Sequence, residues 1–390
     1  MAKRKKPSPH GRSGDPRKRA AEREPETELS VAEATPQLDD EVAAALDSGH
    51  PFEIAMLASS MIAGLEPDDS ATSAGAEELP PPAEFVRMFL GSDDERLQAL
   101  AWTVAQLLPD RRLRSEVAAA VASSAVPDWL AGLAAPEVVA GWQTTDPLQD
   151  SSDVVISLRI GEEDLAVVGL VDFNSDGALK DGFAVPAGLS EFQQAFAASG
   201  ETGMVNRELS PADARTWLTE AIAVGRAAPV PYTTDSWPQA RPLLEWAARQ
   251  CPPGGQGWQR PDQAPVAIKQ DVDRVVAEFA ASPEGNVVGD PADRAVLRDA
   301  LVVIADETGA DPLLLSGVRL ELGLRLLWLT TLHHDLDRLV GLLDTLRAYV
   351  RWAHARRSIP ADDTDVALAV IAHQGAEFIR DVTELLGDDD

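Results

Sequence analysis

Residues 172 to 183, DFNSDGALKDGF, hold the spacing of oxygen donors that comes closest to a metal-binding motif in this chain. Asp172, Asn174, Asp176 and Gly177 occupy the first, third, fifth and sixth positions of the EF-hand calcium loop, D-x-[DN]-x-[DN]-G. Carboxylate and amide oxygens are the ligands that calcium prefers, and the glycine allows the sharp turn between them. The first question is therefore whether this stretch binds calcium.

The rest of the stretch argues against calcium. An EF-hand takes two oxygens from a glutamate at position twelve, whereas this chain has Phe183 there and the cation Lys180 at position nine. An Asx-rich turn explains the pattern without a metal, because Asn and Asp side chains bond their own backbone and glycine accepts positive φ. We therefore predict no metal and no cofactor. Asp172, Asn174, Lys180 and Asp181 form a candidate polar site for a small ligand or for catalysis.

A second group lies within residues 335 to 357, where the spacing of leucine and valine predicts a long helix. Arg347, Arg351 and His354 follow at steps of four and three, so a helix places them together on a face other than the apolar one. They form a candidate anion-binding or nucleic-acid-binding site, with aromatic residues nearby. The alternative is that these cations favour the helix C-terminus and pair with local carboxylates, which are in surplus.

The stretch HHDLD, residues 333 to 337, contains an adjacent pair, His334 and Asp335, that resembles the metal pair of HD phosphohydrolases. Those enzymes also need an upstream histidine to complete the metal shell, and no histidine lies between His50 and His333. Adjacent residues also do not share a helix face. We therefore interpret the stretch as a polar turn between two helices, with Asp335 near the start of the second.

The charge of the chain is divided between two regions. Residues 1 to 23 carry nine Lys or Arg against two acidic residues, a net charge of +7. Because the whole chain carries −30, the remainder carries −37. This acidic body should repel nucleic acid and anionic membranes, whereas the basic arm, Lys3 to Arg23, attracts polyanions. Weak nucleic-acid contact through the arm is one hypothesis, and a solubilising tail with no fixed partner is the other.

Cysteine content and hydropathy predict the compartment. The single cysteine, Cys251, excludes an intrachain disulfide, which fits a reducing cytoplasm. The basic start runs into Pro, Ser and Gly without an apolar segment, so no signal peptide is expected, and no run is long and apolar enough for a membrane span. We expect a soluble cytoplasmic protein without membrane contact. P-loop, Rossmann, G-x-S-x-G and C-x-x-C motifs are absent, which disfavours the enzyme and zinc classes that depend on them.

The pattern of elements predicts a mainly α fold with a small antiparallel β element. Two β-branched runs separated by GEE indicate a hairpin, and FAVP is the candidate third strand, so one hairpin or a three-stranded sheet is expected near residues 153 to 186. Helix starts are well marked: Ser210 is expected to cap a helix that opens at Pro211, and Asp290 precedes Pro291 in the same way.

Three regions are expected. Residues 1 to 38 hold charge, proline and few large apolar side chains, which predicts a disordered basic arm. Residues 39 to 141 are an N-terminal helical unit with a flexible linker at 66 to 82, and residues 142 to 390 are a helical domain that carries the hairpin as an insert (153 to 186).

Three stretches carry a resemblance: GLVDFNSDGALKDGFAVP, WPQARPLLEW and LRAYVRWAHARRSIP. Over residues 150 to 360 the chain resembles an uncharacterised family of Ala- and Arg-rich bacterial proteins, and the resemblance implies a shared architecture without an assigned activity. Two functions stay open. The first is a non-enzymatic interaction protein with an unknown protein partner. The second is an enzyme of unfamiliar type with its polar site at residues 172 to 181.

Overall fold

The computed structural model describes residues 31–66, 80–121, 125–200, 203–229, 232, 234–259, 265–308, 311–331 and 334–387. The chain divides into two compact units, Met1–Glu41 and Val42–Asp390. Most of the predicted arm (1 to 38) and most of the predicted linker (66 to 82) lie outside the described residues, so their disorder and flexibility stay predictions, as do the other predicted region boundaries.

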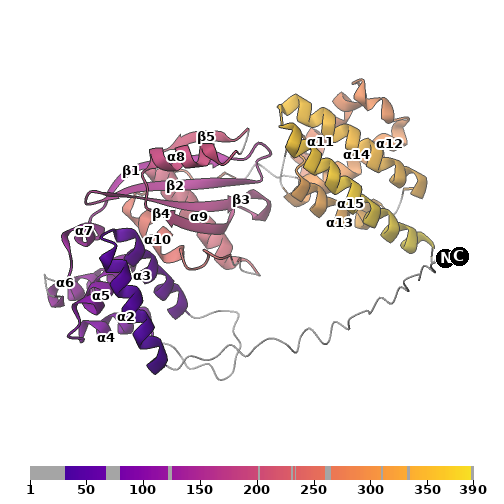
Figure 1. The fold of residues 1–390 in the computed structure, drawn as a ribbon. Coiled ribbons are helices and arrows are strands. Elements are labelled where there is room, and N and C mark those ends of the chain that lie inside the picture. Colours follow the sequence, from indigo (N-terminus) through magenta and orange to yellow (C-terminus); the bar gives the residue numbers. More distant parts are fainter. Residues whose placement is uncertain are drawn as a thin grey trace, which may run out of the picture. The chain divides into compact units, whose positions relative to one another are not determined.

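Helices precede the sheet (Figure 1). Directly before several of them stands a residue whose side chain accepts hydrogen bonds from backbone N–H groups of the first turn. Asp94 accepts a hydrogen bond from Arg96 N, and Asp110 accepts from Arg112 N and Leu113 N, so each carboxylate satisfies backbone donors that the helix leaves open. These elements are α2 (Val31–Asp47), α3 (Pro51–Leu65), α4 (Pro82–Leu90), α5 (Glu95–Leu107), α6 (Arg111–Ala120), α7 (Asp128–Ala131) and η1 (Gly132–Ala134).

The sheet has five antiparallel strands in the order β4-β3-β2-β1-β5. The prediction of one hairpin or three strands near residues 153 to 186 was therefore wrong in size. The two strands that it missed are weak sequence signals: β5 is short and exposed along most of its length, and the first half of β1 is only partly buried. The strands are β1 (Glu137–Thr145), β2 (Ser151–Ile160), β3 (Glu163–Asp172), β4 (Ala178–Val185) and β5 (Val205–Leu209).

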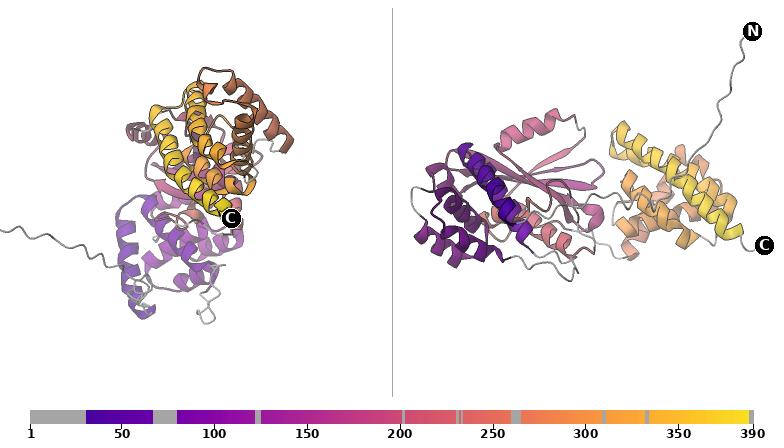
Figure 2. Two further views of the ribbon diagram at one scale, coloured as in Figure 1. Left: turned by 90° about the vertical axis from the view of Figure 1, so that its right-hand side faces the viewer. Right: turned by 60° about the horizontal axis from the view of Figure 1, so that its bottom comes forward.

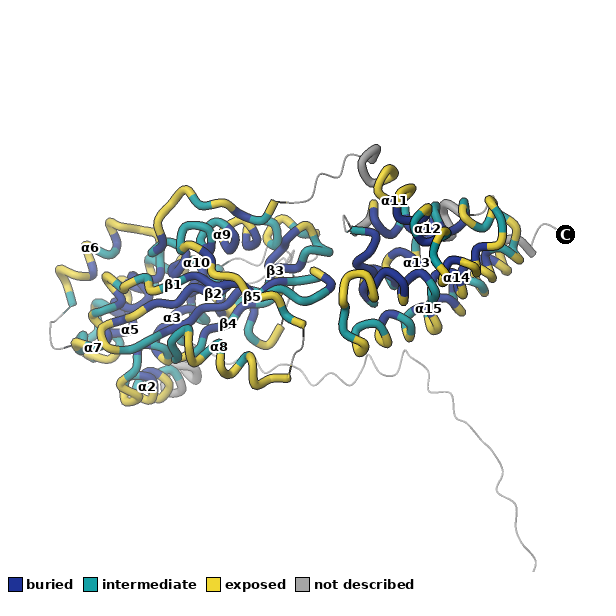
Figure 3. The backbone as a smooth tube through the Cα atoms, turned by 90° about the horizontal axis from the view of Figure 1, so that it is seen from above, coloured by how far each residue is buried: buried dark blue, intermediate teal, exposed yellow. Residues whose placement is uncertain are grey.

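The two faces of the sheet are covered differently. Helices α9 (Pro211–Ala227) and α10 (Arg241–Gln250) pack on one face, where Gly141, Gly169 and Gly182 replace side chains. The opposite face carries a row of large side chains on which α8 (Leu189–Ala198) packs through two phenylalanines; the cluster contains Trp142, Val155, Ala166, Val168, Phe183, Phe192 and Phe196. Figure 3 shows the central strands buried along most of their length.

Helix α10 joins the sheet to the preceding helices. The buried Ser59 hydroxyl of α3 donates to Gln239 O and accepts from Leu243 N, so it fixes the start of α10 against α3. At the other end of α10, Cys251 is 2% exposed, and burial raises the pKa of its thiol to about 11.

The remaining helices pack on one another without strands (Figure 2). Their core centres on Phe279, Tyr349 and Trp352, whose rings lie 5.3 to 5.5 Å apart, and the buried Tyr349 hydroxyl donates to Pro312 O. No helix that the structure describes is long and apolar enough to span a membrane. The elements are α11 (Pro265–Ala280), η3 (Glu284–Val287), α12 (Pro291–Thr308), α13 (Gly317–Thr331), α14 (Leu336–Arg357) and α15 (Ala361–Gly387).

Candidate functional site

The predicted polar loop is the connection between β3 and β4, and it contains the short helix η2 (Phe173–Ser175). Asp172 ends β3 and caps η2, because its Oδ1 accepts from Asn174 N at 2.9 Å. Asp176 adopts the left-handed conformation with φ of 59°, and Gly177 follows with φ of 76°. Trp258 packs so closely on Gly177 that a Cβ there would lie 2.6 Å from the ring, so glycine is needed for both its conformation and its size.

Asp172 is 7% exposed, and both oxygens of its carboxylate have partners. Its Oδ2 accepts from Ser175 Oγ at 3.2 Å and lies 3.5 Å from Lys180 Nζ. Ser175 in turn accepts from the Tyr232 hydroxyl at 2.5 Å. These contacts connect the residues of the loop to one another and to Tyr232.

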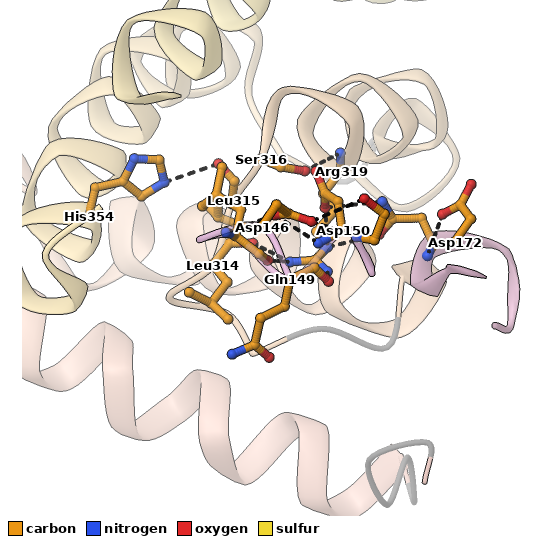
Figure 4. A network of polar contacts seen from close by, with 12 residues as sticks. Asp146, Gln149, Asp150, Asp172, Leu314, Leu315, Ser316, Arg319 and His354 are labelled. Atoms are coloured by element: carbon orange, nitrogen blue, oxygen red, sulfur yellow. Dashed lines mark hydrogen bonds and ion pairs between the residues drawn. The ribbon is translucent and has the colours of Figure 1, made fainter. Parts of the chain in front are cut away.

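Asn174 connects the loop to a buried arginine, Arg319. Figure 4 shows Arg319 close to Asp150 and Ser316. Asn174 Oδ1 accepts from Arg319 Nε at 2.9 Å, and Asn174 Nδ2 donates to Asp150 Oδ1 at 3.0 Å. Arg319 also lies 3.2 Å from Asp150 and donates to the carbonyls of Leu148, Gln149 and Leu314 at 2.6 to 2.8 Å. The guanidinium is 3% exposed, and all of its nitrogens have partners. Arg319 therefore holds the β1–β2 turn, the η2 loop and the start of α13 together.

The β1–β2 turn is shaped for this contact by another carboxylate. Asp146 accepts from Leu148 N, Asp150 N and Ser151 N, which turns the carbonyls of residues 148 and 149 towards Arg319. Burial lowers the pKa of Arg319 and raises that of Asp150, and their mutual attraction opposes both shifts. In the sequence, Arg319 is one of the charged residues within the apolar run of residues 318 to 332. A charged residue in such a run is rarely buried unless it is paired, so its position was the one indication of a buried ion pair.

Asp181 belongs to a different set of contacts. Its Oδ1 accepts from Gly182 N, Thr234 Oγ1 and Ser236 Oγ at 2.6 to 2.8 Å, so it fixes the residues that lead into α10. The four predicted residues of this loop therefore divide into a pair, Asp172 and Lys180, an Asn174 bridge to Arg319, and a separate Asp181. Each of the four has a partner within the fold.

The second predicted group is divided between the surface and the interior. Arg347 pairs with Asp344 at 2.6 Å, and Arg351 is exposed. His354 is 1% exposed, its Nε2 lies 3.1 Å from Leu315 O, and burial lowers the pKa of the ring. His354 is therefore a core residue that holds the segment before α13. Anion binding by Arg347 and Arg351 stays a prediction.

The described part of the HHDLD stretch leads into α14. His333 lies outside the described residues, His334 Nε2 lies 3.1 Å from Asp299 Oδ2, and Asp335 is the residue directly before α14. Over the part of the chain that the structure describes, no three His, Cys, Asp or Glu side chains form a cluster that could hold a metal ion.

A groove of about 660 Å³ lies beside this helix start, and no residue pattern predicted it. Its walls come from η3, the first turns of α12 and the first half of α14. The apolar part of the lining contains Val287, Val296, Leu336 and Leu342, and Val287 is 50% exposed. Gly341 also lines it, and no atom lies within 4 Å of the position that a Cβ would take there.

The rim of the groove is acidic. Arg338 donates to both oxygens of Asp290, at 3.0 and 3.1 Å, and to Asp293 at 2.5 Å. The hydrogen bond from Arg338 is the main reason that the pKa of Asp290 falls to about 2. Asp335 and Asp337 add two exposed carboxylates, so the lining holds Asp293, Asp335 and Asp337 against Arg338, a net charge of −2. Asp290 is not part of the lining but pairs with Arg338 beside it.

Comparisons of the chain with protein families, with curated proteins and with solved structures found no match. The resemblance over residues 150 to 360 therefore stays an expectation.

Proposed function

We propose that this chain is a non-enzymatic binding protein whose groove beside α14 takes a cationic segment of a protein partner. The observation that carries the proposal is the combination in one groove of acidic side chains at the rim with the exposed Val287 and the partly exposed Leu336 in the lining. An amphipathic helix with basic residues along one edge has the complementary surface, and helix-in-groove binding is a recurrent mode of peptide recognition.

Charge supports a cationic partner at two scales. The body carries −37, which draws basic partners from solution and repels acidic ones. At the rim, Asp290 and Asp293 already share Arg338, whereas Asp335 and Asp337 project at the helix start, with the Asp335 side chain 88% exposed. A partner's Lys or Arg therefore meets exposed carboxylates without first breaking a buried ion pair.

The contacts of the polar loop favour binding over catalysis. An enzyme at residues 172 to 181 would depend on Lys180, which lies 3.5 Å from Asp172, and on Asp172, Asn174 and Asp181. The side-chain oxygens of Asp172, Asn174 and Asp181 accept hydrogen bonds from the loop itself, from Arg319 and from the residues before α10. Catalytic groups need room for a reacting atom within hydrogen-bond reach, and these side chains are committed to the fold.

Two further parts of the proposal rest on the sequence. The lone cysteine, which excludes an intrachain disulfide, favours a reducing compartment such as the cytoplasm. The arm from Lys3 to Arg23 supplies weak, sequence-independent nucleic-acid contact, which would bring the acidic body near its partner.

The test is direct binding of a labelled peptide to the full chain. The probe is a fluorescent amphipathic helix with Leu on one face and Lys and Arg on the other, followed by anisotropy. We expect saturable binding, and we expect Asp335→Asn with Asp337→Asn to weaken it about three- to tenfold, the effect of two exposed charge contacts.

The matched control removes the same charge from another helix start. Asp362→Asn with Asp365→Asn changes two exposed aspartates among the first five residues of α15 and should leave affinity within about twofold. A peptide of the same shape with Glu for Lys and Arg should not bind. Equal weakening by the two double variants would show general charge attraction and contradict binding in the groove.

A further inference from the structure

A smaller pocket of about 290 Å³ lies between α9 and α10, on the part of these helices that does not face the sheet. Arg215, Arg226 and Arg249 line it together with Thr219, Ala223 and Glu245. Three arginines around one small pocket contrast with a body that carries −37. The charge available to a ligand depends on which of these arginines already pair with carboxylates.

Two arginines of this region are neutralised by glutamates. Arg226 lies 2.8 Å from Glu245 Oε1, and Arg241 pairs with Glu66. Arg226 also lies 3.8 Å from Glu66. These two cations and two carboxylates form a closed network beside the pocket.

The other arginines contact only backbone carbonyls. Arg215 donates to Cys251 O at 2.7 Å, Arg249 donates to Leu107 O, and neighbouring Arg114 donates to Leu108 O at 2.5 Å. Among the described residues, no carboxylate forms an ion pair with any of these three. Carbonyl oxygens at the end of α5 accept one hydrogen bond from Arg114 and one from Arg249. A guanidinium has five N–H donors and a full positive charge, so these bonds use only part of what each side chain can donate.

The charges around the pocket act on Arg249. Burial lowers the pKa of Arg249, the charge of Glu245 raises it, and the charges of Arg114 and Arg215 lower it. The lining of the pocket holds three arginines against Glu245, a net charge of +2 within the acidic body. An anion between Arg215 and Arg249 would relieve the repulsion between these two cations.

We propose that the pocket between α9 and α10 binds a compact phosphate-type dianion, held by Arg215 and Arg249 with the Thr219 hydroxyl as a further donor. Guanidinium groups match phosphate oxygens bidentately, which makes phosphate a better partner than a halide. The volume is at the small end of ligand pockets, so the occupant is inorganic phosphate or a small monoester. This site is independent of the groove beside α14.

The experiment titrates the full chain with inorganic phosphate and with methyl phosphate by calorimetry, at constant ionic strength kept with sodium chloride. We expect one saturable site. Ala223→Glu places a negative charge at an exposed position of the lining and removes no arginine contact, so it should weaken binding at least about tenfold. Ala195→Glu adds the same charge at an exposed position of α8 and should leave binding within about twofold.

Two substitutions at Arg249 distinguish the contribution of its positive charge to binding from that of its planar guanidinium. Arg249→Gln should abolish binding, and Arg249→Lys should retain part of it, because a lysine keeps the charge but not the fork. Should Arg249→Gln fail to fold, the Ala223→Glu comparison still decides. Tighter binding of methyl phosphate than of inorganic phosphate identifies a monoester as the ligand class, and the reverse order identifies free phosphate. The proposal is overturned if neither anion binds below about 10 mM, or if Ala223→Glu binds as well as the native chain.

Discussion

Arg319 shows how one residue can connect segments that are far apart in the chain. It lies in the first turn of α13, yet its partners include the β1–β2 turn near residue 148 and Asn174 in the η2 loop. A guanidinium can do this because its donors point in fixed, divergent directions, whereas an ammonium group is a compact point charge. Asn174, which occupies a ligand position of the calcium-loop pattern, accepts a hydrogen bond from this internal arginine.

Arg319→Met should lower the free energy of unfolding by about 3 to 5 kcal/mol, because it leaves Asp150 and several carbonyls buried without their partner. Urea unfolding of the full chain measures the change. Arg325→Met is the control, since Arg325 is exposed and its partner among the described residues is Glu321 on the same helix, and it should cost less than about 0.5 kcal/mol. Similar losses for both variants would contradict the role assigned to Arg319.

At the scale of elements, the sheet is built so that helices approach one face closely. Gly141 lies under the start of α9, where a Cβ would be 2.9 Å from Leu209 O and 3.1 Å from Ala214 Cβ. Gly169 and Gly182 are paired across β3 and β4 on the same face, and side chains of α9 and α10 fill the space above them. On the other face, Trp142 supplies bulk where the glycines supply room.

Gly141→Ala should destabilise the protein by about 1 to 3 kcal/mol, since the added methyl meets a backbone oxygen that cannot move without shifting β5. The same change at Gly64 of α3 should have the opposite sign. No atom lies near the position of its Cβ, and alanine favours a helix over glycine by about 0.5 to 1 kcal/mol. Thermal and urea unfolding of the two variants give the comparison, and destabilisation by both would refute the steric argument.

Elements with strong local signals could be predicted from the sequence, and elements held by distant contacts could not. Ser210 caps α9 at Pro211, and Asp290 precedes α12 at Pro291, both as predicted, because capping depends on neighbouring residues. Strand β5 was missed, since four of its five residues are exposed and only pairing with β1 makes it a strand.

The candidate sites follow the same division. The Asx contacts of Asp172 are local, whereas the burial of His354 and the arginine pocket depend on packing between helices, which residue spacing does not encode.

For the whole molecule, charge separates two kinds of partner. The arm's +7 favours a polyanion, and the body's −37 opposes one, so any nucleic-acid affinity should depend on the arm. Two regions of the acidic body bear on its partners: the groove beside α14 has an acidic lining, whereas the pocket between α9 and α10 has a basic one. The second is too small for a nucleic acid chain.

Removing residues 1 to 23 should therefore abolish gel-shift binding of nucleic acid at low salt, and intact-chain binding should fall on the order of a thousandfold between about 50 and 200 mM salt if six phosphates are contacted. Arg347→Ala with Arg351→Ala is the comparison, because that pair is the rival site, and it should change little. A truncated chain that still binds, together with a double variant that does not, would transfer the site to α14.

The reaction rate of the buried Cys251 thiol can report how often the end of α10 opens. Only the thiolate reacts with alkylating or disulfide reagents, and a buried thiol with a pKa near 11 is almost entirely protonated at neutral pH. The reagent must wait until the end of α10 opens, so the modification rate reports how often that helix end leaves its place. Because the chain has one cysteine, every labelled molecule records the same event, beside Arg215 and the basic pocket.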